Sequence, residues 1–405
     1  MINGRVIVCI ASSWDYDPTS KHHIMKILSR HNDIVWINYH GTRRPQMTRT
    51  DLRASLSALK RIVQGVDRVS PSIVQMTPLV IPGAGNQLMR SLHERMLVGQ
   101  IRRAVRAIDP AGKKPLQVWS FAPDVPSLVQ SLGEECFVYY CVDEHSQFDG
   151  VDADRIRRAE AELVKRADLV ITSSKTLMEA KQAVRPDAVL MRHGVDFERF
   201  SAAWREQLPC PSDLQTIPRP IFGFFGVVHT WIDVRLIAAV ARLRPQYSFV
   251  IIGECLVDVS ELHRLENVHV LGRRPNSELP SYCAAFEAGL MPFQRTELTR
   301  SVNPIKMLEY LAAGLPVVST SLPEARRFNG SISIADQPGS FAAACDDILS
   351  SNHSGRRSEI SSAVESESWL SKVERLSTII EDRIRANESP CTISESAGRC
   401  CAGVL

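Results

Sequence analysis

Several features that are common in other protein classes are missing from this sequence. Its ten cysteines include no C-x-x-C pair and no Cys/His cluster at zinc-ligand spacing, which argues against the common zinc modules. No window approaches the ~20 apolar residues that a membrane helix requires, and the apolar run within residues 1–10 is too short for a secretory signal. The loop after the first apolar strand lacks the G-x-G-x-x-G pattern of dinucleotide-binding folds. We therefore expect a cytoplasmic protein in which Cys9, Cys141 and Cys255 are free, buried thiols, and we do not expect a dehydrogenase.

The chain also has little net charge, +3, and that charge is unevenly distributed. Basic residues exceed acidic ones in the first half, and two clusters stand out: Arg43, Arg44, Arg49, Arg53, Lys60, Arg61 and Arg68, and then Arg90, Arg95, Arg102, Arg103 and Arg106. The second cluster accompanies apolar residues at helical spacing, from Leu97 to Ile108. Such a segment fits an anionic inner-leaflet membrane surface, or a helix whose apolar stripe packs on a sheet while its arginines are solvated. The second interpretation is slightly favoured. No aromatic residues accompany the arginines, so no nucleic acid partner is expected.

What the sequence does contain is a repeated alternation of short aliphatic runs with longer amphipathic segments. Val6 to Val8, Leu169 to Ile171 and Phe249 to Ile252 are such runs, and they are typical of parallel strands that are covered on both faces. A chain of 405 residues is too long for one ordinary core. We predict an α/β fold of two doubly wound, Rossmann-like domains that face each other across a cleft.

The expected boundaries follow from composition. Residues 1–200 form an N-terminal domain, and the proline-rich segment 201–220 is interpreted as a linker. Residues 221–370 form the second domain. Residues 371–388 continue a helical pattern that begins at Trp369, and residues 389–405, with Cys400 and Cys401, are expected to be a disordered tail.

The most informative segment is Asn303 to Thr320, with the sequence NPIKMLEYLAAGLPVVST. Pro304 suits the first position of a helix, and Gly314 suits its end in the left-handed conformation. Lys306 and Glu309 stand three residues apart, so they project from the same side of this helix. A helix N-terminus with a lysine suits a phosphate, and a carboxylate one turn further suits two ribose hydroxyls. A solvated ion pair on a surface helix is the commoner fate of such residues, but the apolar surroundings favour the binding interpretation.

The pattern P-x-K-x-x-E-Y-L-A-x-G-x-P-V-V-x-T resembles the nucleotide-sugar-binding signature of group 1 glycosyltransferases of the GT-B fold. Further stretches follow the order of that family, and they lie at 139–144 (YYCVDE), 166–174 (RADLVITSS), 193–200 (HGVDFERF), 222–226 (FGFFG), 248–254 (SFVIIGE) and 269–274 (HVLGRR). The resemblance covers roughly residues 5–385 and is greatest to the teichuronic-acid and exopolysaccharide branch. It implies that residues 371–388 form a C-terminal helix that crosses back to the first domain, although a helix that caps the second domain would show the same pattern. It implies transfer of a sugar from a nucleoside-diphosphate sugar to a saccharide acceptor, often lipid-linked, with no cofactor and no bound metal. The protein would then be cytoplasmic, with a peripheral position on the inner membrane face as one option.

The sequence departs from the wider family at two places. Many relatives carry two glutamates separated by seven residues, of which the first contacts the donor sugar, and at the position that corresponds to the first this chain has Ser301. Many also carry an Arg and a Lys after the first glycine loop, and residues 227–231 contain neither. These departures leave Lys306 as the expected phosphate cation, and they leave the donor sugar and the stereochemistry open.

The remaining donor-site candidates come from loops that follow strands of the second domain. Asn303, Pro304 and Ile305 open the signature helix, while Gly223 and Gly226 would let the backbone approach a diphosphate, unless they only form a tight turn. By resemblance, Arg273 and Arg274 frame the nucleobase, although they are equally consistent with solvated loop residues. His229 is a weaker phosphate candidate.

The first domain must supply a general base for the acceptor hydroxyl. Asp143 directly follows the strand predicted at residues 136–142 and is the first choice, with Asp15 second. An N-cap on the following helix would explain Asp143 equally well.

Two other function classes stay open. A nucleotide-sugar epimerase of the same fold would turn over without an acceptor, and a noncatalytic scaffold would have no need for both Lys306 and Glu309.

Overall fold

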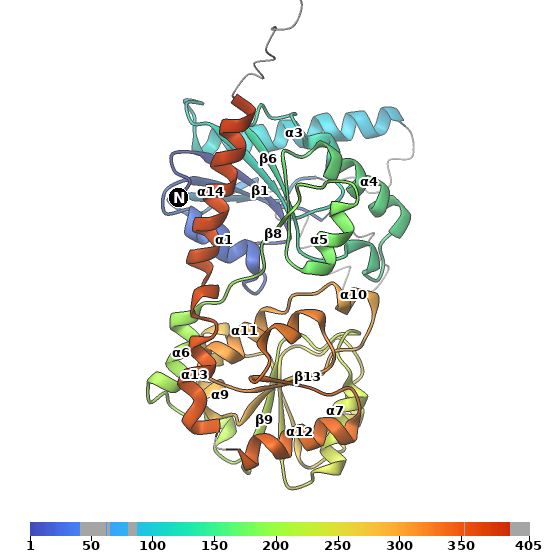
Figure 1. The fold of residues 1–405 in the computed structure, drawn as a ribbon. Coiled ribbons are helices and arrows are strands. Elements are labelled where there is room, and N and C mark those ends of the chain that lie inside the picture. Colours follow the sequence, from blue (N-terminus) through green and yellow to red (C-terminus); the bar gives the residue numbers. More distant parts are fainter. Residues whose placement is uncertain (41–61, 63–64, 80–86, 352, 389–405) are drawn as a thin grey trace, which may run out of the picture.

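The computed structural model describes residues 1–40, 62, 65–79, 87–351 and 353–388, which form two α/β domains, one above the other in Figure 1. The first domain holds an eight-stranded sheet in the order β3-β4-β2-β1-β5-β6-β7-β8, which is parallel except for the edge strand β3. The second holds a six-stranded, fully parallel sheet in the order β11-β10-β9-β12-β13-β14. The predicted α/β class with two doubly wound units is confirmed.

The first domain alternates strands and helices. Its strands are β1 (Val6–Ala11), β2 (Asp33–Asn38), β3 (Val66–Ser70), β4 (Ile73–Met76), β5 (Leu116–Ser120), β6 (Cys136–Cys141), β7 (Leu169–Thr172) and β8 (Val189–Leu190). Its helices are α1 (Ser20–Leu28), α3 (Gln87–Ile108), α4 (Ala153–Arg166) and α5 (Lys175–Gln182), with short 3-10 turns η1 (Pro126–Leu128) and η2 (His145–Gln147).

The second domain repeats this plan. Its strands are β9 (Ile221–Phe225), β10 (Ser248–Ile252), β11 (Val268–Gly272), β12 (Ala288–Met291), β13 (Val317–Ser319) and β14 (Ile332–Ile334). Its helices are α6 (Phe197–Arg205), α7 (Val234–Leu243), α8 (Ser260–His263), α9 (Leu279–Ala285), α10 (Glu297–Arg300), α11 (Ile305–Ala312), α12 (Pro338–Ser350) and α13 (Arg357–Ser362). Five 3-10 turns complete this half: η3 (Ser212–Leu214), η4 (Asn276–Glu278), η5 (Pro323–Phe328), η6 (His353–Arg356) and η7 (Glu365–Glu367).

The strands read as unbroken apolar runs because both faces of each sheet are covered. In β1, Ile7 and Cys9 face one hydrophobic cluster of the first domain, whereas Val8 and Ile10 face the other. Because successive side chains of a strand point to opposite faces, a half-exposed sheet would have required polar residues at every second position.

The segment expected to be a linker is packed instead. Phe200 and Ala203 of α6, together with Leu214 and Ile217, are buried in the hydrophobic cluster of the second domain. The chain therefore enters the second domain near Val195, and residues 201–220 form part of it. Four prolines in this stretch resembled a linker, but the apolar residues between them are enough to anchor it.

The last helix, α14 (Trp369–Glu388), leaves the second domain and lies along the first, beside α1 (Figure 1). Trp369, Val373, Leu376 and Ile380 are buried in the same cluster as the β1 side chains Ile7 and Cys9. The helix therefore ties the end of the chain back to the first domain. The tail expected at residues 389–405 lies outside the described residues.

The arginine-rich helix α3 places its apolar stripe against the first sheet. Leu97, Ile101 and Ala104 are buried in a first-domain cluster, and Arg102 and Arg103 are exposed. This is the packing that the slightly favoured interpretation requires. Of the earlier basic cluster, only Arg68 lies within the described residues. In the described part of the chain, no helix combines the length and the apolar character needed to cross a membrane.

The described cysteines are free thiols, as expected. Cys9 and Cys141 are buried in strands, and Cys255 is half-buried. Cys400 and Cys401 lie outside the described residues. Among the described residues, no cluster of His, Cys, Asp or Glu is arranged to hold a metal ion.

Candidate active site

The predicted signature helix is α11, and it begins where the two domains meet. Pro304 has ψ of 119° and acts as the N-cap, so the helix starts at Ile305, one residue later than predicted. Gly314 has φ of +71° and ends the helix in the left-handed conformation, as predicted. Ile305 packs against a hydrophobic cluster of the first domain, which places the N-terminus of α11 at the domain interface.

Hydrogen bonds around the start of α11 join the two domains. The Asn303 side chain donates to the Ser173 carbonyl at 2.8 Å, and Ser174 Oγ donates to the Ser301 carbonyl at 2.6 Å. Ser301 Oγ donates to the carbonyl of Glu297 at 3.3 Å, within the same loop. Asn303 therefore serves the interface through its side-chain amide, while its Oδ1 is buried without a hydrogen-bond partner.

Lys306 is half-buried and lies against two aromatic rings. Its Nζ is 4.6 Å from the ring centroid of Phe224 and 5.4 Å from that of Phe293, distances typical of cation–π contacts. Among the described residues, no carboxylate lies within ion-pair distance of this ammonium. The rings hold the side chain in place without neutralising it, so its charge is available to an anion.

Gly226 provides the close approach to Lys306. Gly226 is the first residue after β9 and has φ of +129°. An added Cβ at this position would collide with Lys306 Nζ. Only glycine adopts this conformation readily and leaves this space. Gly223 has a different role, because it lies inside β9, where a Cβ would collide with the ring of Phe286. The structure thus gives Gly223 a role in core packing, and a contact of Gly223 with a donor stays a prediction.

Burial shifts the pKa of both charged residues of α11 toward neutrality. It lowers the pKa of Lys306 to about 8, although the charge of Glu309 opposes this shift. It raises the pKa of Glu309 to about 7, against the effect of Lys306 and of Arg199. Arg199 lies on α6 and donates to the carbonyl of Asn276, in the loop after β11. Glu309 thus has Lys306 and Arg199 among the charges that act on it, and Arg199 contacts the loop expected to meet the nucleobase.

The two arginines of that loop are both engaged, in different ways. Arg273 forms an exposed 2.6 Å ion pair with Asp17, which follows β1 in the first domain. Arg274 donates two hydrogen bonds to Asp213 and one to the hydroxyl of Tyr282, so it stabilises the second domain internally. Neither is a freely solvated arginine, and Arg273 is the one that reaches the interface.

His229 lies in the loop after β9 and is held by its neighbours. Its ring stacks on Trp231 with centroids 4.0 Å apart, and its Nδ1 accepts from the backbone N–H of Thr230. The hydroxyl of Thr230 in turn donates to Asp149 of the first domain at 3.4 Å. The loops that follow β1, β6, β9 and β11 therefore meet at the interface, which shows that the carboxyl edges of the two sheets face each other.

Asp143 follows β6 at this edge and does not cap a helix. The next regular helix, α4, is capped by Asp152, and the intervening turn η2 has Glu144 at its N-cap position. Burial raises the pKa of Asp143 to about 6, with Lys21 opposing the shift. Lys21, at the start of α1, is itself half-buried, and burial lowers its pKa. The helix-cap explanation of Asp143 is therefore removed.

Asp15 is exposed in the loop after β1, and its backbone N–H lies 3.4 Å from Ser13 Oγ. The neighbouring histidines support the fold. His22 packs between Trp14 and Trp36, and His23 stacks on Trp369 of α14 with centroids 5.1 Å apart. The loop after β1 thus brings two exposed carboxylates, Asp15 and Asp17, to the interface edge, while the histidines of α1 take part in packing.

Comparison with known proteins identifies the second domain. Residues 219–351 match the sequence model of the family "Glycosyl transferases group 1". These residues belong to the group 1 glycosyltransferases. They include both Lys306 and Glu309, so the resemblance inferred from the signature segment is confirmed.

One curated relative of this chain is TuaH of Bacillus subtilis strain 168, whose name assigns it provisionally to teichuronic acid biosynthesis. The two sequences are 33% identical over 209 residues, which is 49% of this chain and 52% of TuaH. The chain thus spans about half the length of the curated relative it matches.

Solved structures show the same GT-B architecture over most of the chain. HepE of Anabaena, determined with UDP and glucose, matches with a TM-score of 0.64 and 14% identity, covering 93% of this chain and 99% of HepE. The α,α-trehalose-phosphate synthase (UDP-forming) of Burkholderia vietnamiensis matches with a TM-score of 0.67 and 13% identity, covering 96% and 99%. At these identities the likeness shows the fold.

Sequence reasoning missed four contributors to the candidate site. Lys21 had a signal, because it opens the helix after the first strand. Arg199 lies in a segment that was assigned to the end of the first domain, and its proximity to Glu309 depends on the packing of α6. The rings of Phe224 and Phe293 come from different strands, β9 and the end of β12, and only the sheet brings both to Lys306.

Proposed function

We propose that this protein transfers a sugar from a nucleoside-diphosphate sugar to a saccharide acceptor. The observation that carries the proposal is the presence of both Lys306 and Glu309 on α11. This helix lies inside the part of the chain that matches the group 1 glycosyltransferases. The ammonium of Lys306 has two aromatic neighbours and no acid at ion-pair distance among the described residues. A diphosphate would supply that missing negative charge.

The order of the strands supports one orientation for the donor. Lys306 and Gly226 lie at the end of β9, and Glu309 lies toward Arg199 and the loop after β11. The diphosphate would therefore bind at β9, the ribose at Glu309 and the nucleobase near Arg273. The loop after β11 would be held in place by Arg274, and the start of α11 by Pro304 and Ile305. The side chain of Asn303 would fix the contact between the two domains. His229 would lie beside the diphosphate, at the edge of the loop that follows Gly226.

Asp143 is the proposed general base. It lies at the carboxyl edge of the first sheet, which faces the donor domain, and its raised pKa of about 6 suits proton acceptance near neutral pH. Lys21 would keep the carboxylate ionised through its positive charge. Asp15, which is exposed in the neighbouring loop, is the alternative base. The family resemblance supports a reaction without a bound metal or cofactor.

The relatives suggest which substrates to examine first. HepE was solved with UDP and glucose, and another structure of HepE contains UDP-glucose. TuaH is named for teichuronic acid biosynthesis. We therefore propose a role in bacterial cell-surface polysaccharide synthesis, with a UDP-sugar as donor and a lipid-linked saccharide as acceptor. The exposed arginines of α3 would allow a peripheral position at an anionic membrane.

The proposal is tested with the purified full chain. A thermal-shift screen against UDP-, GDP- and dTDP-sugars should raise the melting temperature with one nucleotide class, because ligand bound to the native state stabilises it. Calorimetry then gives the affinity for that nucleotide in the wild type and in Lys306→Met. Failure of all three nucleotide classes to bind would refute the proposal. Turnover of the sugar nucleotide in the absence of any acceptor would indicate an epimerase instead.

A further inference from the structure

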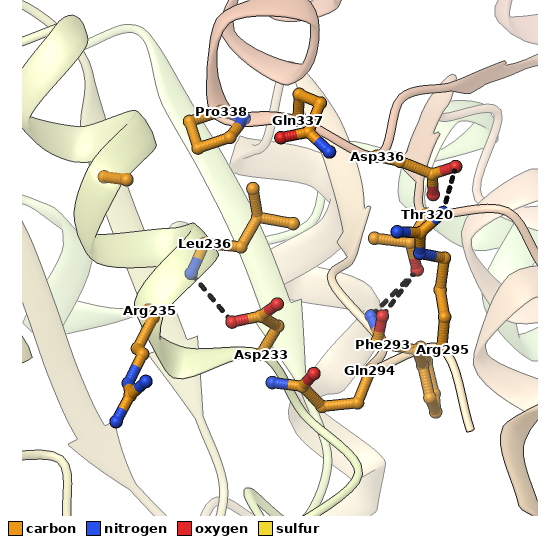
Figure 2. Close-up of a pocket in the computed structure, with 11 residues that line it drawn as sticks. Asp233, Arg235, Leu236, Phe293, Gln294, Arg295, Thr320, Asp336, Gln337 and Pro338 are labelled. Carbon is orange, nitrogen blue, oxygen red and sulfur yellow. Dashed lines mark hydrogen bonds and ion pairs between the residues drawn. The ribbon is translucent and has the colours of Figure 1, made fainter.

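The pocket shown in Figure 2 belongs to the site already described. Asp233, Gln294 and Thr320 line it at the carboxyl edge of the second sheet, and Phe293, which also lines it, contacts Lys306. A different group of polar residues is buried in the first domain and has no role in that site as described. We call it the β6 network, and it comprises Tyr139, Cys141, Glu144, Ser146, Glu160 and Lys181.

The centre of the β6 network is a buried ion pair between two helices. Glu160 of α4 is 4% exposed, Lys181 of α5 is 8% exposed, and Lys181 Nζ lies 2.7 Å from Glu160 Oε2. The other carboxylate oxygen of Glu160 accepts from the hydroxyl of Tyr139, on β6, at 2.6 Å. Burial acts to raise the pKa of Glu160, but Lys181 and the hydrogen bonds lower it overall. Burial acts to lower the pKa of Lys181, but its neighbours Cys141, Glu160 and Glu144 raise it overall, so the pair is ionised.

A buried ion pair is poorly suited to stabilise a core. The attraction between the two charges only partly offsets the free energy needed to remove them from water, and well-packed apolar residues often serve as well or better. Leu163 of α4 and Leu177 of α5 are buried in the same cluster as Tyr139, so apolar residues would suit this place too. Stability alone therefore does not account for the pair, and its contacts with the loop after β6 indicate a positional role.

One arm of the β6 network reaches the residue that follows Asp143. Lys181 Nζ lies 3.7 Å from Glu144 Oε2, and the other carboxylate oxygen of Glu144 accepts from Ser146 Oγ at 2.7 Å. Glu144 is the N-cap residue of the turn η2, and Ser146 lies within that turn. Lys181 therefore holds the turn after Asp143 against α5.

A second arm reaches Asp143 itself. Cys141 Sγ lies 3.5 Å from Glu160 Oε1 and 3.5 Å from the carbonyl oxygen of Asp143, which also accepts from the backbone N–H of His145. Asp143 is half-buried, and the charge of Lys21 acts on its carboxylate from α1, which packs on the opposite face of the sheet. The backbone of Asp143 is thus held from the face that carries the β6 network.

We propose that Glu160 and Lys181 are positioning residues for Asp143. Through Glu144 and Cys141 they fix the loop after β6, so that the Asp143 carboxylate stays half-buried at the carboxyl edge of the first sheet. The inference rests on the proposed function where it concerns Asp143 as the general base. The environment of Asp143 itself can be measured without turnover.

Two altered forms of the full chain test this inference. The first combines Tyr139→Phe, Glu160→Leu and Lys181→Met, which removes the ion pair and its hydroxyl partner together. The second is Glu144→Ala, which keeps the buried pair and removes one link to the loop. Because Glu144 is not part of the buried pair, the second form decides the question if the first fails to fold.

The matched control is Glu162→Leu with Lys165→Met, which makes the same two changes at exposed positions of α4. Carbon-13 NMR of protein labelled at the aspartate carboxyl carbons measures the titration of Asp143, and Asp143→Asn identifies its signal. Mass spectrometry measures hydrogen exchange in residues 143–147. Initial rates at several pH values give kcat and the KM for the donor.

In the wild type and the control, Asp143 should have a pKa of about 6. In the altered forms water reaches the loosened loop, so this pKa should fall by about one unit or more toward the ordinary value of about 4. Residues 143–147 should exchange about fivefold faster or more. The value of kcat should fall about tenfold or more at an unchanged donor KM, and the acid limb of its pH profile should move with the pKa of Asp143.

The inference is overturned if Asp143 has an ordinary pKa in the wild type, or if both altered forms match the control in titration and exchange. A loss of stability without those changes would show that the β6 network is only structural. A shift in the first form alone supports the inference and assigns the link to Cys141. If the wild type transfers no sugar from any donor, the proposed function fails, and the titration still decides whether the network positions Asp143.

Discussion

Lys306 and Glu309 are three residues apart on α11, and burial draws the pKa of the first down to about 8 and of the second up to about 7. Their charged forms are therefore less stable than in water, and each gains from a ligand that restores favourable contacts. At the residue scale, the proposed function depends on these two side chains and on Asp143.

Lys306→Met should weaken binding of a nucleoside diphosphate much more than binding of the bare nucleoside, because only the diphosphate meets the ammonium. Calorimetry with UDP and uridine measures both, and Lys165→Met, an exposed lysine of α4, is the matched control. Equal losses for the two ligands would show that Lys306 only shapes the pocket.

Glu309→Ala should cost about 1–3 kcal/mol of donor binding, the usual loss for hydrogen bonds to a charged group.

The affinity of the wild type for UDP-glucose should be greatest between about pH 7 and 8. Protonation of Glu309 reduces its capacity to accept below that window, and Lys306 loses its charge above it. Titration calorimetry from about pH 5.5 to 9 checks this, with Glu309→Gln expected to flatten the acid side. A wild-type affinity that is constant with pH would contradict both assignments.

Asp143→Asn keeps the shape of the side chain and removes the base. Turnover should fall on the order of a hundredfold, with donor affinity near that of the wild type, because the base acts mainly in the transition state. Initial rates with the identified donor and acceptor measure this. Near-normal turnover would move the proposed base to Asp15.

At the element scale, α14 holds the end of the chain against the first domain through one apolar stripe. Leu376 is fully buried in that contact, whereas Leu370, on the same helix, is 44% exposed. The contrast offers a comparison in which the chemical change is identical and only the burial differs.

Leu376→Ala should lower the free energy of unfolding of the first domain by about 2–5 kcal/mol, from lost burial and the cavity left behind. Leu370→Ala should change it by no more than about 0.5 kcal/mol, as is usual for exposed positions. Urea denaturation followed by circular dichroism measures both. Equal effects of the two changes would mean that α14 is not docked on the first domain in solution.

At the scale of the whole molecule, Glu324 links the two domains. Its carboxylate is 2% exposed, accepts from the backbone N–H of Lys175 at the start of α5, and pairs with Arg192 at 2.6 Å. The exposed pair of Arg273 and Asp17 makes a second link near the candidate site. The buried contact is expected to fix the relative position of the domains more strongly than the exposed one.

Glu324→Ala should loosen this interface, because it leaves Arg192 without its carboxylate partner, a change that costs about 3–5 kcal/mol in buried pairs. Faster hydrogen exchange at the start of α5 and a larger radius of gyration in X-ray scattering are the expected readouts. Glu359→Ala breaks an exposed pair with Arg356 and should change neither. Unchanged exchange in Glu324→Ala would show that the domains are held by other contacts.

The sequence by itself determined the α/β class, the two-domain plan and the signature helix with Lys306 and Glu309. These are local properties: apolar runs mark strands covered on both faces, and the spacing of two charged residues fixes their side of a helix. The resemblance to the group 1 glycosyltransferases rested on the same short segments. Gly314 also followed from local geometry, since few residues other than glycine end a helix at positive φ.

Only the tertiary structure decided which residues share a site. Packing gave Gly223 a role in the core and drew 201–220 into the second domain. It also brought Arg199 toward Glu309 and set the rings of Phe224 and Phe293 beside Lys306. These contacts join segments that are far apart in the chain. Their distances depend on strand order and helix packing, which local patterns of hydrophobicity and charge do not encode.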